Sequence, residues 1–220
     1  MASSQIKYIA IEGVIGAGKT SLAKMLAKKL NAKLVLESFE DNPFLEKFYK
    51  NPRRYALHTQ MFFLMSRYKQ LLELRQDDLF HEYIISDYIF EKDKIFAYLN
   101  LADDELELYE KMVSFIERNL QTPDLVIYLQ STVERLMSNI NKRGRSAEKN
   151  ISETYISDLN EAYNYFFFRF KASRVMIVNA TDIDFVNNES DFNELINEIL
   201  KPVHGNIEYF NPSVKKAADK

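Results

Sequence analysis

One stretch decides the fold of this 220-residue chain: Gly13-Val14-Ile15-Gly16-Ala17-Gly18-Lys19-Thr20. It follows the pattern G-x-x-x-x-G-K-[ST], in which glycines let the backbone turn tightly and present its N–H groups to phosphate. The apolar run before it, at residues 8–11, is typical of a buried strand, and the apolar residues at helical spacing in 21–30 predict a helix after it. A strand, a glycine loop and a helix in this order predict a phosphate-binding loop rather than an ordinary turn.

We therefore expect this loop and the start of the following helix to bind the phosphates of a nucleotide. The N-terminus of the helix adds a favourable field for an anion. Lys19 reaches the β- and γ-phosphates, and the Thr20 hydroxyl is a ligand for Mg²⁺. The residues that we expect to bind the nucleotide here are Gly13, Gly16, Ala17, Gly18, Lys19, Thr20 and Ser21.

Composition narrows the class of protein. The chain is 46% hydrophobic and 28% charged, which supports one α/β domain with a sizeable core. A net charge of −3 argues against a nucleic-acid binder, and the absence of cysteine excludes disulfides and thiolate chemistry. The chain has no run of about 18 apolar residues, and residues 1–5 before the first strand are too short for a signal peptide. We expect a cytoplasmic protein without a membrane or nucleic-acid partner.

Apolar runs and helical periodicity alternate along the chain. Strands are predicted at residues 8–11, 33–36, 82–86, 124–129 and 174–178. Helices are predicted at residues 21–30, before Asn51-Pro52, and at 55–75, 90–99, 103–119, 132–142, 152–170 and 191–200. This alternation predicts a five-stranded parallel sheet flanked by helices on both faces. We expect one domain over residues 1–201 and a loose tail over 202–220.

Polar residues follow the predicted strands where a ligand would lie. Glu37 stands after the second strand and Asp87 after the third. In open α/β sheets, ligands bind beyond the carboxyl ends of the strands. Gln60 and Arg67 are seven residues apart on the long helix, so they share one face.

From the glycine loop to the last helix, the chain resembles the deoxyribonucleoside kinase family. Four features carry the resemblance: Glu37 after the second strand, the stretch from Gln60 to Arg67 on one helix, the carboxylates Asp87 and Asp93 after the third strand, and Lys142-Arg143-Gly144-Arg145 with Glu148. The last of these resembles the family's arginine lid, at about residues 142–150. The stretch from Glu37 to Phe44 is most similar to bacterial members that prefer purine deoxynucleosides.

The resemblance implies a P-loop kinase fold and a reaction. The enzyme would transfer the γ-phosphate of ATP to the 5′-hydroxyl of a deoxyribonucleoside, a purine such as deoxyadenosine or deoxyguanosine, in deoxynucleotide salvage. ATP and Mg²⁺ would be required, with the metal held by Thr20 and Asp87. Relatives are commonly homodimers, so we expect a homodimer here.

The resemblance also assigns roles to individual residues. Glu37 would be the general base, and Lys19, Arg143 and Arg145 would stabilise charge on the transferring phosphoryl group. The residues that would bind the deoxynucleoside are Glu37, Phe39, Asn42, Tyr49, Gln60, Phe63, Arg67, Asp87, Asp93 and Glu148. Among them, Arg67 and Asp93 would act as a pair that binds the nucleobase. Tyr49 and Glu148 would hold the sugar 3′-hydroxyl. The adenine of ATP would lie at Asp184 and Phe185, with Arg143 over the triphosphate.

Several of these residues have an ordinary structural explanation as well. Phe39, Asn42, Phe44 and Phe63 have the same appearance in a sequence whether they line a base or belong to the core. A basic run such as that at 142–145 is equally typical of a solvated face.

The chain departs from the family pattern at one position. The family usually has an arginine after the carboxylate that follows the third strand, whereas this chain has Tyr88. A tyrosine carries no charge at neutral pH and cannot make the bidentate contact of an arginine. We expect Lys19, Arg143 and Arg145 to stabilise the charge of the phosphates in place of the missing arginine.

Two other functions remain open at this point. A thymidylate kinase or other nucleoside monophosphate kinase shares the loop and the lid, but it needs a basic site for the acceptor phosphate. Glu37, Glu40 and Asp41 would repel that phosphate. A non-catalytic, nucleotide-binding regulatory protein is the second alternative, and a turnover assay would separate it from an enzyme.

Overall fold

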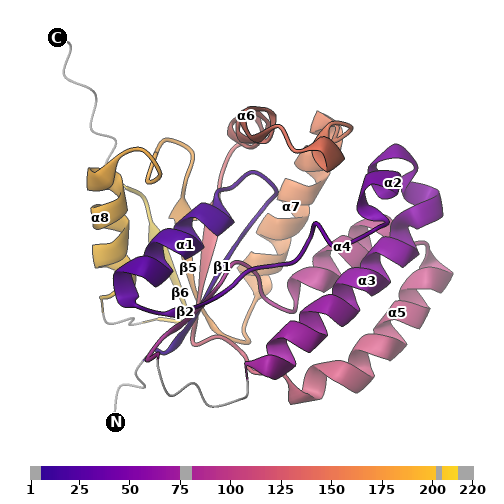
Figure 1. Ribbon diagram of the computed structural model, residues 1–220, viewed down its shortest axis with the longest axis horizontal. Coiled ribbons are helices and arrows are strands. Elements are labelled where there is room, and N and C mark those ends of the chain that lie inside the picture. The colour runs from indigo at the N-terminus through magenta and orange to yellow at the C-terminus, as the bar shows by residue number, and fades with distance from the viewer. Residues whose placement is uncertain (1–5, 75–80, 202–204, 213–220) are drawn as a thin grey trace.

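The computed structural model describes residues 6–74, 81–201 and 205–212 (Figure 1). Its strands are Tyr8–Gly13 (β1), Lys33–Val35 (β2), Ile84–Ser86 (β3), Leu125–Gln130 (β4), Arg174–Asn179 (β5) and Ile207–Phe210 (β6). Its α-helices are Lys19–Leu30 (α1), Leu45–Lys50 (α2), Pro52–Glu73 (α3), Lys92–Asn100 (α4), Asp103–Ile116 (α5), Val133–Arg143 (α6), Glu153–Arg169 (α7) and Glu189–Ile199 (α8). Short 3-10 turns lie at Glu117–Asn119 (η1) and Ser146–Glu148 (η2).

The strands form one parallel sheet in the order β2-β3-β1-β4-β5-β6. From β1 the chain crosses through α1 to β2, and from β4 it crosses in the opposite direction through α6 and α7 to β5. Because such crossovers are right-handed, α1 and α7 cover opposite faces of the sheet. The predicted parallel α/β sheet with helices on both faces is confirmed.

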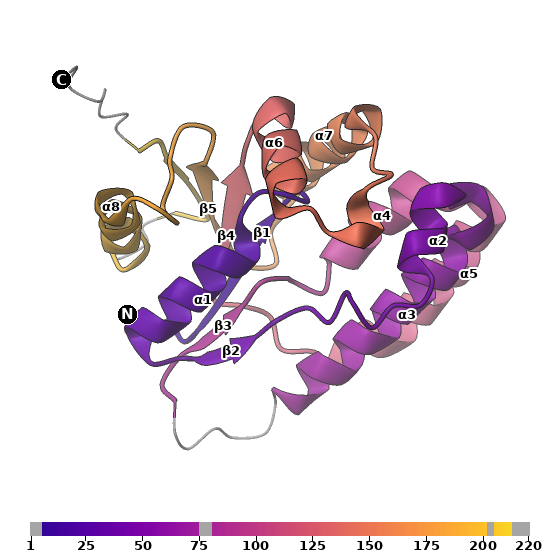
Figure 2. The same cartoon turned by 45° about the horizontal axis from the view of Figure 1, so that its top comes forward.

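The helices α2 to α5 gather beside the sheet, on the side away from α8 (Figure 2). The long helix α3 packs against α2, α4 and α5, and α4 packs against α7. This group stands over the carboxyl ends of β2 and β3, so it forms the outer wall of any site at that edge.

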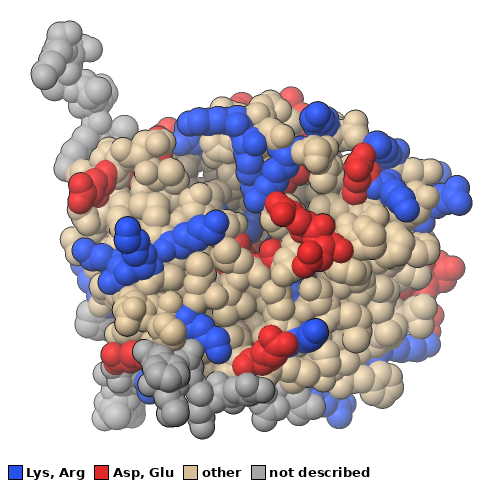
Figure 3. All heavy atoms as spheres, in the orientation of Figure 1, with Lys and Arg blue, Asp and Glu red and all other residues tan. Residues whose placement is uncertain are grey.

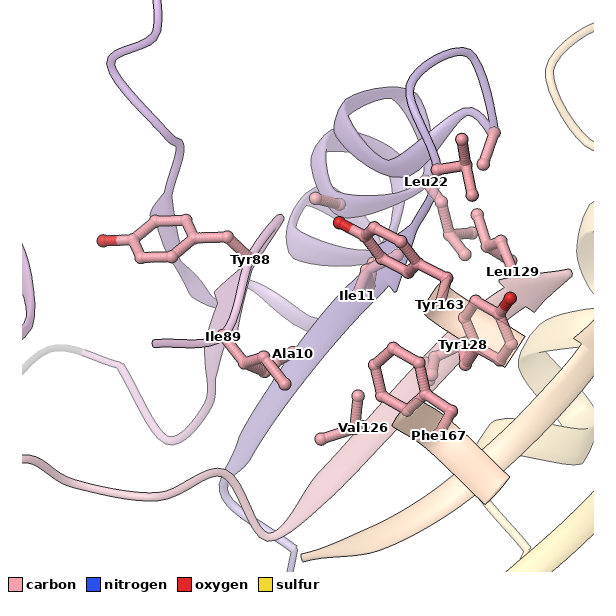
Figure 4. Packing of buried hydrophobic residues seen from close by; sticks show 14 of the residues in the cluster. Ala10, Ile11, Leu22, Tyr88, Ile89, Val126, Tyr128, Leu129, Tyr163 and Phe167 are labelled. Atoms are coloured by element: carbon pink, nitrogen blue, oxygen red, sulfur yellow. The ribbon is translucent and has the colours of Figure 1, made fainter. Parts of the chain in front are cut away.

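An aromatic cluster fills the core between β4 and α7 (Figure 4). The ring of Tyr128 stacks on that of Phe167, with centroids 4.4 Å apart, and Tyr163 lies beside both. All three side chains are buried. The Tyr128 hydroxyl donates to Asn164 Oδ1 at 2.7 Å, so this polar group is not left unpaired in the core.

Two local features differ from the sequence-based expectation. Residues 207–210 lie in the predicted tail but form β6, which makes the sheet six-stranded rather than five-stranded. Four residues give too short a pattern to identify, and this strand depends on its pairing with β5. Helix α3 begins at Pro52, three residues before the predicted start, because a proline fits the first turn of a helix. Its predicted last residue, Arg75, lies outside the described residues, as do residues 1–5.

Among the described residues, none of the helices combines the length and the apolar character needed to cross a membrane.

Candidate active site

The glycine loop connects the end of β1 to the start of α1. Gly16 and Gly18 have φ angles of 90° and 95°, in the left-handed region that favours glycine. A Cβ at Gly16 would lie 2.6 Å from the backbone oxygen of Leu136, so α6 also excludes a side chain there. The Lys19 ammonium donates to the carbonyl oxygens of Gly13 and Val14 at 2.8 and 3.1 Å. The predicted loop geometry is present, and its lysine folds back over it.

A cavity, partly open to solvent, lies beyond the carboxyl ends of β1, β2 and β3. We call it the main cavity. Most of the predicted site residues line it: Lys19, Thr20, Glu37, Phe39, Tyr49, Gln60, Phe63, Arg67, Asp87, Arg143, Arg145 and Glu148. Segments distant in sequence, from the loop to the lid, therefore meet in one place.

Glu37 is held between two cations in the main cavity. Arg67 contacts one carboxylate oxygen, with Nε 2.7 Å and Nη2 2.5 Å from Oε1. Lys92 contacts the other oxygen, with Nζ 2.6 Å from Oε2. Burial alone would raise the pKa of Glu37, but the charges of Arg67 and Lys92 outweigh it and hold that pKa well below its usual range. The carboxylate is therefore ionised at any physiological pH.

Arg67 also contacts Asp93, as the sequence predicts. The Nη1 group pairs with Asp93 Oδ1, and the other oxygen of Asp93 accepts from the Tyr109 hydroxyl at 2.9 Å. Asp93 is fully buried behind Arg67 and does not line the main cavity. Its position fits a residue that orients Arg67 rather than one that touches a ligand.

Thr20 and Asp87 meet at the bottom of the main cavity. The Thr20 hydroxyl donates to Asp87 Oδ2 at 2.6 Å, and the other carboxylate oxygen accepts from the backbone N–H of Glu37 at 2.8 Å. The described residues contain no group of three or more His, Cys, Asp and Glu side chains placed around one metal ion. A hydroxyl and one carboxylate beside a phosphate loop nevertheless fit Mg²⁺, which takes few protein ligands and completes its shell with phosphates and water.

Two charged residues of this site were missed by the sequence analysis. Lys92 is buried in the main cavity, as described above. Glu12, the residue before the loop, is fully buried, and its carboxylate accepts from the backbone N–H groups of Gly13 and Ile89 at 3.0 and 2.9 Å. Burial raises the pKa of Glu12, while the charges of Lys92 and Lys19 oppose that change. A glutamate within an apolar strand is a signal for Glu12, whereas no local signal marks Lys92.

The two arginines of the predicted lid contact Glu148. Arg143 Nη2 lies 2.6 Å from both carboxylate oxygens of Glu148, and Arg145 Nη1 lies 3.5 Å from Oε1. Arg145 also stacks over Phe39, with its guanidinium carbon 4.0 Å from the ring centroid. Gly144 ends α6 with a φ of 64°, which lets the chain turn so that both arginines face the cavity. Basic side chains gather over α6 and the segment after it (Figure 3).

A second hollow lies on the other side of the glycine loop, and we call it the loop groove. The predicted Asp184 and Phe185 line it together with Gly16, Ala17, Gly18 and Ser21. The Phe185 ring is packed so closely on the loop that a Cβ at Gly18 would lie 2.9 Å from it. Arg143 lines both the loop groove and the main cavity, so the two hollows meet at the lid. The groove also contains Arg135, Asn139 and Lys142, which the sequence analysis did not single out.

The outer end of the main cavity is formed by Gln60 and Phe63 on α3. The Gln60 side-chain nitrogen donates to the backbone oxygen of Asp93 at 2.7 Å, which fixes the amide and leaves its oxygen as an acceptor. Tyr49 lies in the same cavity, near Glu148 and Tyr155. Burial raises the pKa of Tyr49 well above its ordinary value, so its hydroxyl stays protonated.

The predicted nucleoside-binding residue Asn42 needs correction, and Phe44 and Tyr88, whose positions the sequence left open, also lie outside the main cavity. Asn42 does not line the main cavity, because its amide donates to Thr59 O and accepts from Phe44 N to form the turn before α2. Phe44 faces away from the cavity and packs against His58, with ring centroids 5.4 Å apart. Tyr88 is fully buried, and its hydroxyl donates to Gln70 Oε1 at 3.0 Å, outside the cavity.

The electrostatic argument against a phosphorylated acceptor also changes. Glu40 and Asp41 are exposed and lie outside the main cavity. Glu37 lines it, but Arg67 and Lys92 match its charge. The acidic repulsion that the sequence predicts is therefore absent, and the identity of the acceptor depends on other evidence.

Comparison with known proteins provides that evidence. The model of the family described as deoxynucleoside kinase matches residues 9–204. A deoxyguanosine kinase of Bacillus subtilis (strain 168) is 38% identical over 193 residues, which cover 86% of this chain and 93% of that protein. A deoxyadenosine/deoxycytidine kinase of the same organism is 30% identical over 208 residues, covering 90% and 94%. The solved structure of a deoxyadenosine kinase from M. mycoides with bound dATP superposes with a TM-score of 0.77 at 27% identity, covering 89% of this chain and 100% of that one.

Proposed function

The chain belongs to the deoxynucleoside kinase family and is an ATP-dependent phosphotransferase, and we propose that its acceptor is a purine deoxynucleoside, deoxyguanosine or deoxyadenosine. The purine assignment is supported by the names of the relatives, which include a deoxyguanosine kinase at 38% identity. One structural observation carries the proposal: the loop groove and the main cavity meet at Arg143. A nucleotide in the groove and a nucleoside in the cavity would direct their reacting ends toward the same point.

Glu37 is proposed as the general base. The 5′-oxygen forms a bond to the γ-phosphorus while the bond from that phosphorus to the β,γ-bridging oxygen breaks. ADP leaves with the electron pair, and the hydroxyl proton goes to the Glu37 carboxylate. The pKa of Glu37 is held below its usual range by Arg67 and Lys92, so it is a weak base. A loose phosphoryl-transfer transition state needs little activation of the nucleophile, so orientation by a well-placed weak base is sufficient.

Thr20 and Asp87 are proposed to hold Mg²⁺, directly or through water. Their side chains are 2.6 Å apart at the edge of the loop, where the β- and γ-phosphates would lie. When bound, the metal would neutralise charge on these phosphates. Lys19 would turn from the loop carbonyls to the same phosphates.

The deoxynucleoside and ATP would be oriented by two different sets of residues, one in the main cavity and one in the loop groove. At the outer end of the main cavity, the fixed amide of Gln60 and the ring of Phe63 would meet the deoxynucleoside base. Tyr49 and Glu148 would meet the sugar, which requires Glu148 to exchange part of its contact with Arg143. Phe185 and Asp184 would hold the adenine of ATP in the loop groove.

We further propose a cytoplasmic homodimer with a role in purine salvage. Large apolar side chains at 108, 112 and 115 are exposed on one face of α5, and Phe115 is 80% exposed. A second copy would remove this apolar face from water. Light scattering tests the assembly, because Phe115→Glu should convert a dimer to a monomer, whereas a monomeric wild-type protein would contradict the proposal.

A transfer assay with γ-labelled ATP tests the reaction and the acceptor together. All four deoxynucleosides and their 5′-monophosphates are compared at equal concentration. We expect the largest kcat/KM with deoxyguanosine or deoxyadenosine. Faster turnover of a monophosphate would favour a monophosphate kinase, and ATP binding without turnover of any acceptor would favour a regulatory protein.

A further inference from the structure

Lys92 occupies a position that lysine rarely takes. It is only 5% exposed, which is rare for a lysine unless its charge is matched, as it is here by Glu37. It is also the first residue of α4, where the helix dipole disfavours a positive charge. Unusual placements of this kind concentrate at functional sites, where the surrounding structure maintains them for a purpose.

The contacts of the ammonium are incomplete. In the part of the chain that the structure describes, Glu37 Oε2 is the acceptor within hydrogen-bonding distance, at 2.6 Å. An ammonium carries three N–H donors, and another close neighbour of this one in the described structure is the ring of Phe96, whose centroid is 5.8 Å away. The ammonium therefore has hydrogen-bonding capacity beyond its contact with Glu37. Lys92 lines the main cavity together with Lys19 and Thr20, so these donors lie beside the phosphate loop.

A second cation lies close to Lys92. Lys19 and Lys92 both line the main cavity beside the phosphate loop. The fold therefore holds two ammonium groups near each other in a partly desolvated cavity. An anion that contacts both would remove this repulsion, and the γ-phosphate of the proposed donor is the anion that must reach this point.

We propose that Lys92 is a catalytic residue that donates hydrogen bonds both to Glu37 and to the phosphoryl group in transfer. During the step, the 5′-hydroxyl proton neutralises Glu37, which weakens the hold of the carboxylate on Lys92. The ammonium then stabilises the charge on the transferring phosphoryl group and its new ester. Lys92 keeps its own proton throughout. This role rests on the proposed function, because it takes γ-phosphoryl transfer as the reaction.

The principal test is Lys92→Met, which keeps an unbranched side chain, one heavy atom shorter, and removes its charge. Removing one preorganised donor from a reacting oxygen typically lowers the rate about 10²–10³-fold, and we expect a loss of kcat of this size. Affinity for ADP should stay within about threefold by calorimetry, whereas affinity for ADP with aluminium fluoride and the deoxynucleoside, a mimic of the transition state, should fall with kcat. Lys94→Met is the matched control, since Lys94 lies on the same helix and pairs with Glu117. Wild-type kcat in Lys92→Met would overturn the proposal.

A second variant separates contact with phosphate from support of Glu37. If Lys92 only positions Glu37, then Lys92→Met should change nothing further in a Glu37→Gln background. If it also touches the phosphoryl group, the double variant should be slower than Glu37→Gln by about tenfold or more, and should bind the mimic correspondingly more weakly. Equal rates in the single and double variants would reduce Lys92 to a positioning residue.

Chemical rescue tests the ammonium at position 92 without relying on the folding of Lys92→Met. The chain contains no cysteine, so Lys92→Cys introduces a unique thiol. Alkylation with 2-bromoethylamine in denaturant forms an S–C bond with loss of bromide and a proton, and places an ammonium at the reach of a lysine. After refolding, with the wild-type protein treated in parallel, we expect at least about tenfold recovery of kcat. No recovery in refolded protein would overturn the proposal. If the untreated wild-type protein turns over none of the acceptors, the proposed function is refuted. The affinity of wild-type protein and Lys92→Met for the transition-state mimic would still test Lys92.

Discussion

The Arg67 guanidinium lies against the Glu37 carboxylate, with Nε 2.7 Å from Oε1, and joins residues 30 positions apart in the chain. Arg67 also pairs with Asp93, so a single guanidinium connects the proposed base to a buried carboxylate on α4. The side chain of Arg67 is only 4% exposed. Any change in this group should therefore affect both the chemistry at Glu37 and the stability of the fold.

Glu37→Gln should lower kcat by about 10²–10⁴-fold with little change in KM. The amide keeps the shape of the side chain but cannot take the 5′-hydroxyl proton. Steady-state kinetics with ATP and the preferred deoxynucleoside measure the effect. Glu40→Gln is the control, because Glu40 is exposed and lies outside the main cavity. A wild-type kcat in Glu37→Gln would remove Glu37 from the role of base.

Arg67→Ala and Asp93→Ala should interact strongly in a double-mutant cycle. Arg67→Ala leaves the buried Asp93 with only the Tyr109 hydroxyl, whereas Asp93→Ala leaves Arg67 with Glu37 as its partner. Breaking a buried pair costs at most about 3–5 kcal/mol, and less where water enters or another partner remains. The double variant should therefore be less destabilised than the sum of the single effects, by more than about 0.5 kcal/mol in the free energy of unfolding. Urea unfolding and kcat/KM measure the cycle. Strict additivity in both would contradict the contact.

Binding of ATP should take up protons near pH 8. Burial and then the charge of Lys92 lower the pKa of Lys19 to about 8, so about half of these side chains are neutral at that pH. The triphosphate favours the charged ammonium and raises its pKa, so binding should take up about half a proton. Affinity should fall as the pH rises above 8. Calorimetry in buffers of different ionisation enthalpy measures the uptake.

Lys92→Met should reduce the proton uptake that accompanies ATP binding. Lys92→Met removes a charge that lowers the pKa of Lys19, so more Lys19 should already be charged before ATP binds. Proton uptake at pH 8 should then decrease. An enthalpy of binding that does not depend on the buffer in the wild-type protein would argue against the lowered pKa.

The lid arginines and Tyr88 should behave differently on substitution. Arg143→Ala and Arg145→Ala should each lower kcat at least about 10²-fold, since both line the main cavity and are proposed to stabilise charge on the phosphoryl group. Tyr88→Phe should leave kcat nearly unchanged, because its hydroxyl donates to Gln70 outside the cavity. That variant should lose about 1 kcal/mol of unfolding free energy. Near wild-type rates in both lid variants, with an inactive Tyr88→Phe, would reverse these roles.

An arginine at position 88 should not raise the activity. The Tyr88 side chain is buried among core residues, so Tyr88→Arg would place a larger, charged side chain in a largely desolvated position. We expect a lower melting temperature and no gain in kcat. A stable and faster Tyr88→Arg enzyme would show that the side chain at 88 can turn toward the cavity.

The sequence alone determined the features that are encoded by neighbours in the chain. The octet from Gly13 to Thr20 requires a tight loop between a strand and a helix, and the alternation of apolar runs and helical periods leads to a parallel sheet. Glu37 and Asp87 were predicted to meet because the carboxyl ends of parallel strands lie at one edge, whereas only the family resemblance placed Arg143 beside them. These expectations needed only local geometry and the topology that follows from it.

Only the tertiary structure decided which charges lie together. Lys92 reaches Glu37 across 55 positions, and Glu12 is enclosed by backbone groups from Gly13 and Ile89. No local pattern distinguishes a buried lysine at the start of a helix from a solvated one, because its environment is formed by other segments. The same reason applies to β6, whose four residues pair with β5, and to Tyr88, whose hydroxyl contacts Gln70 on the distant helix α3.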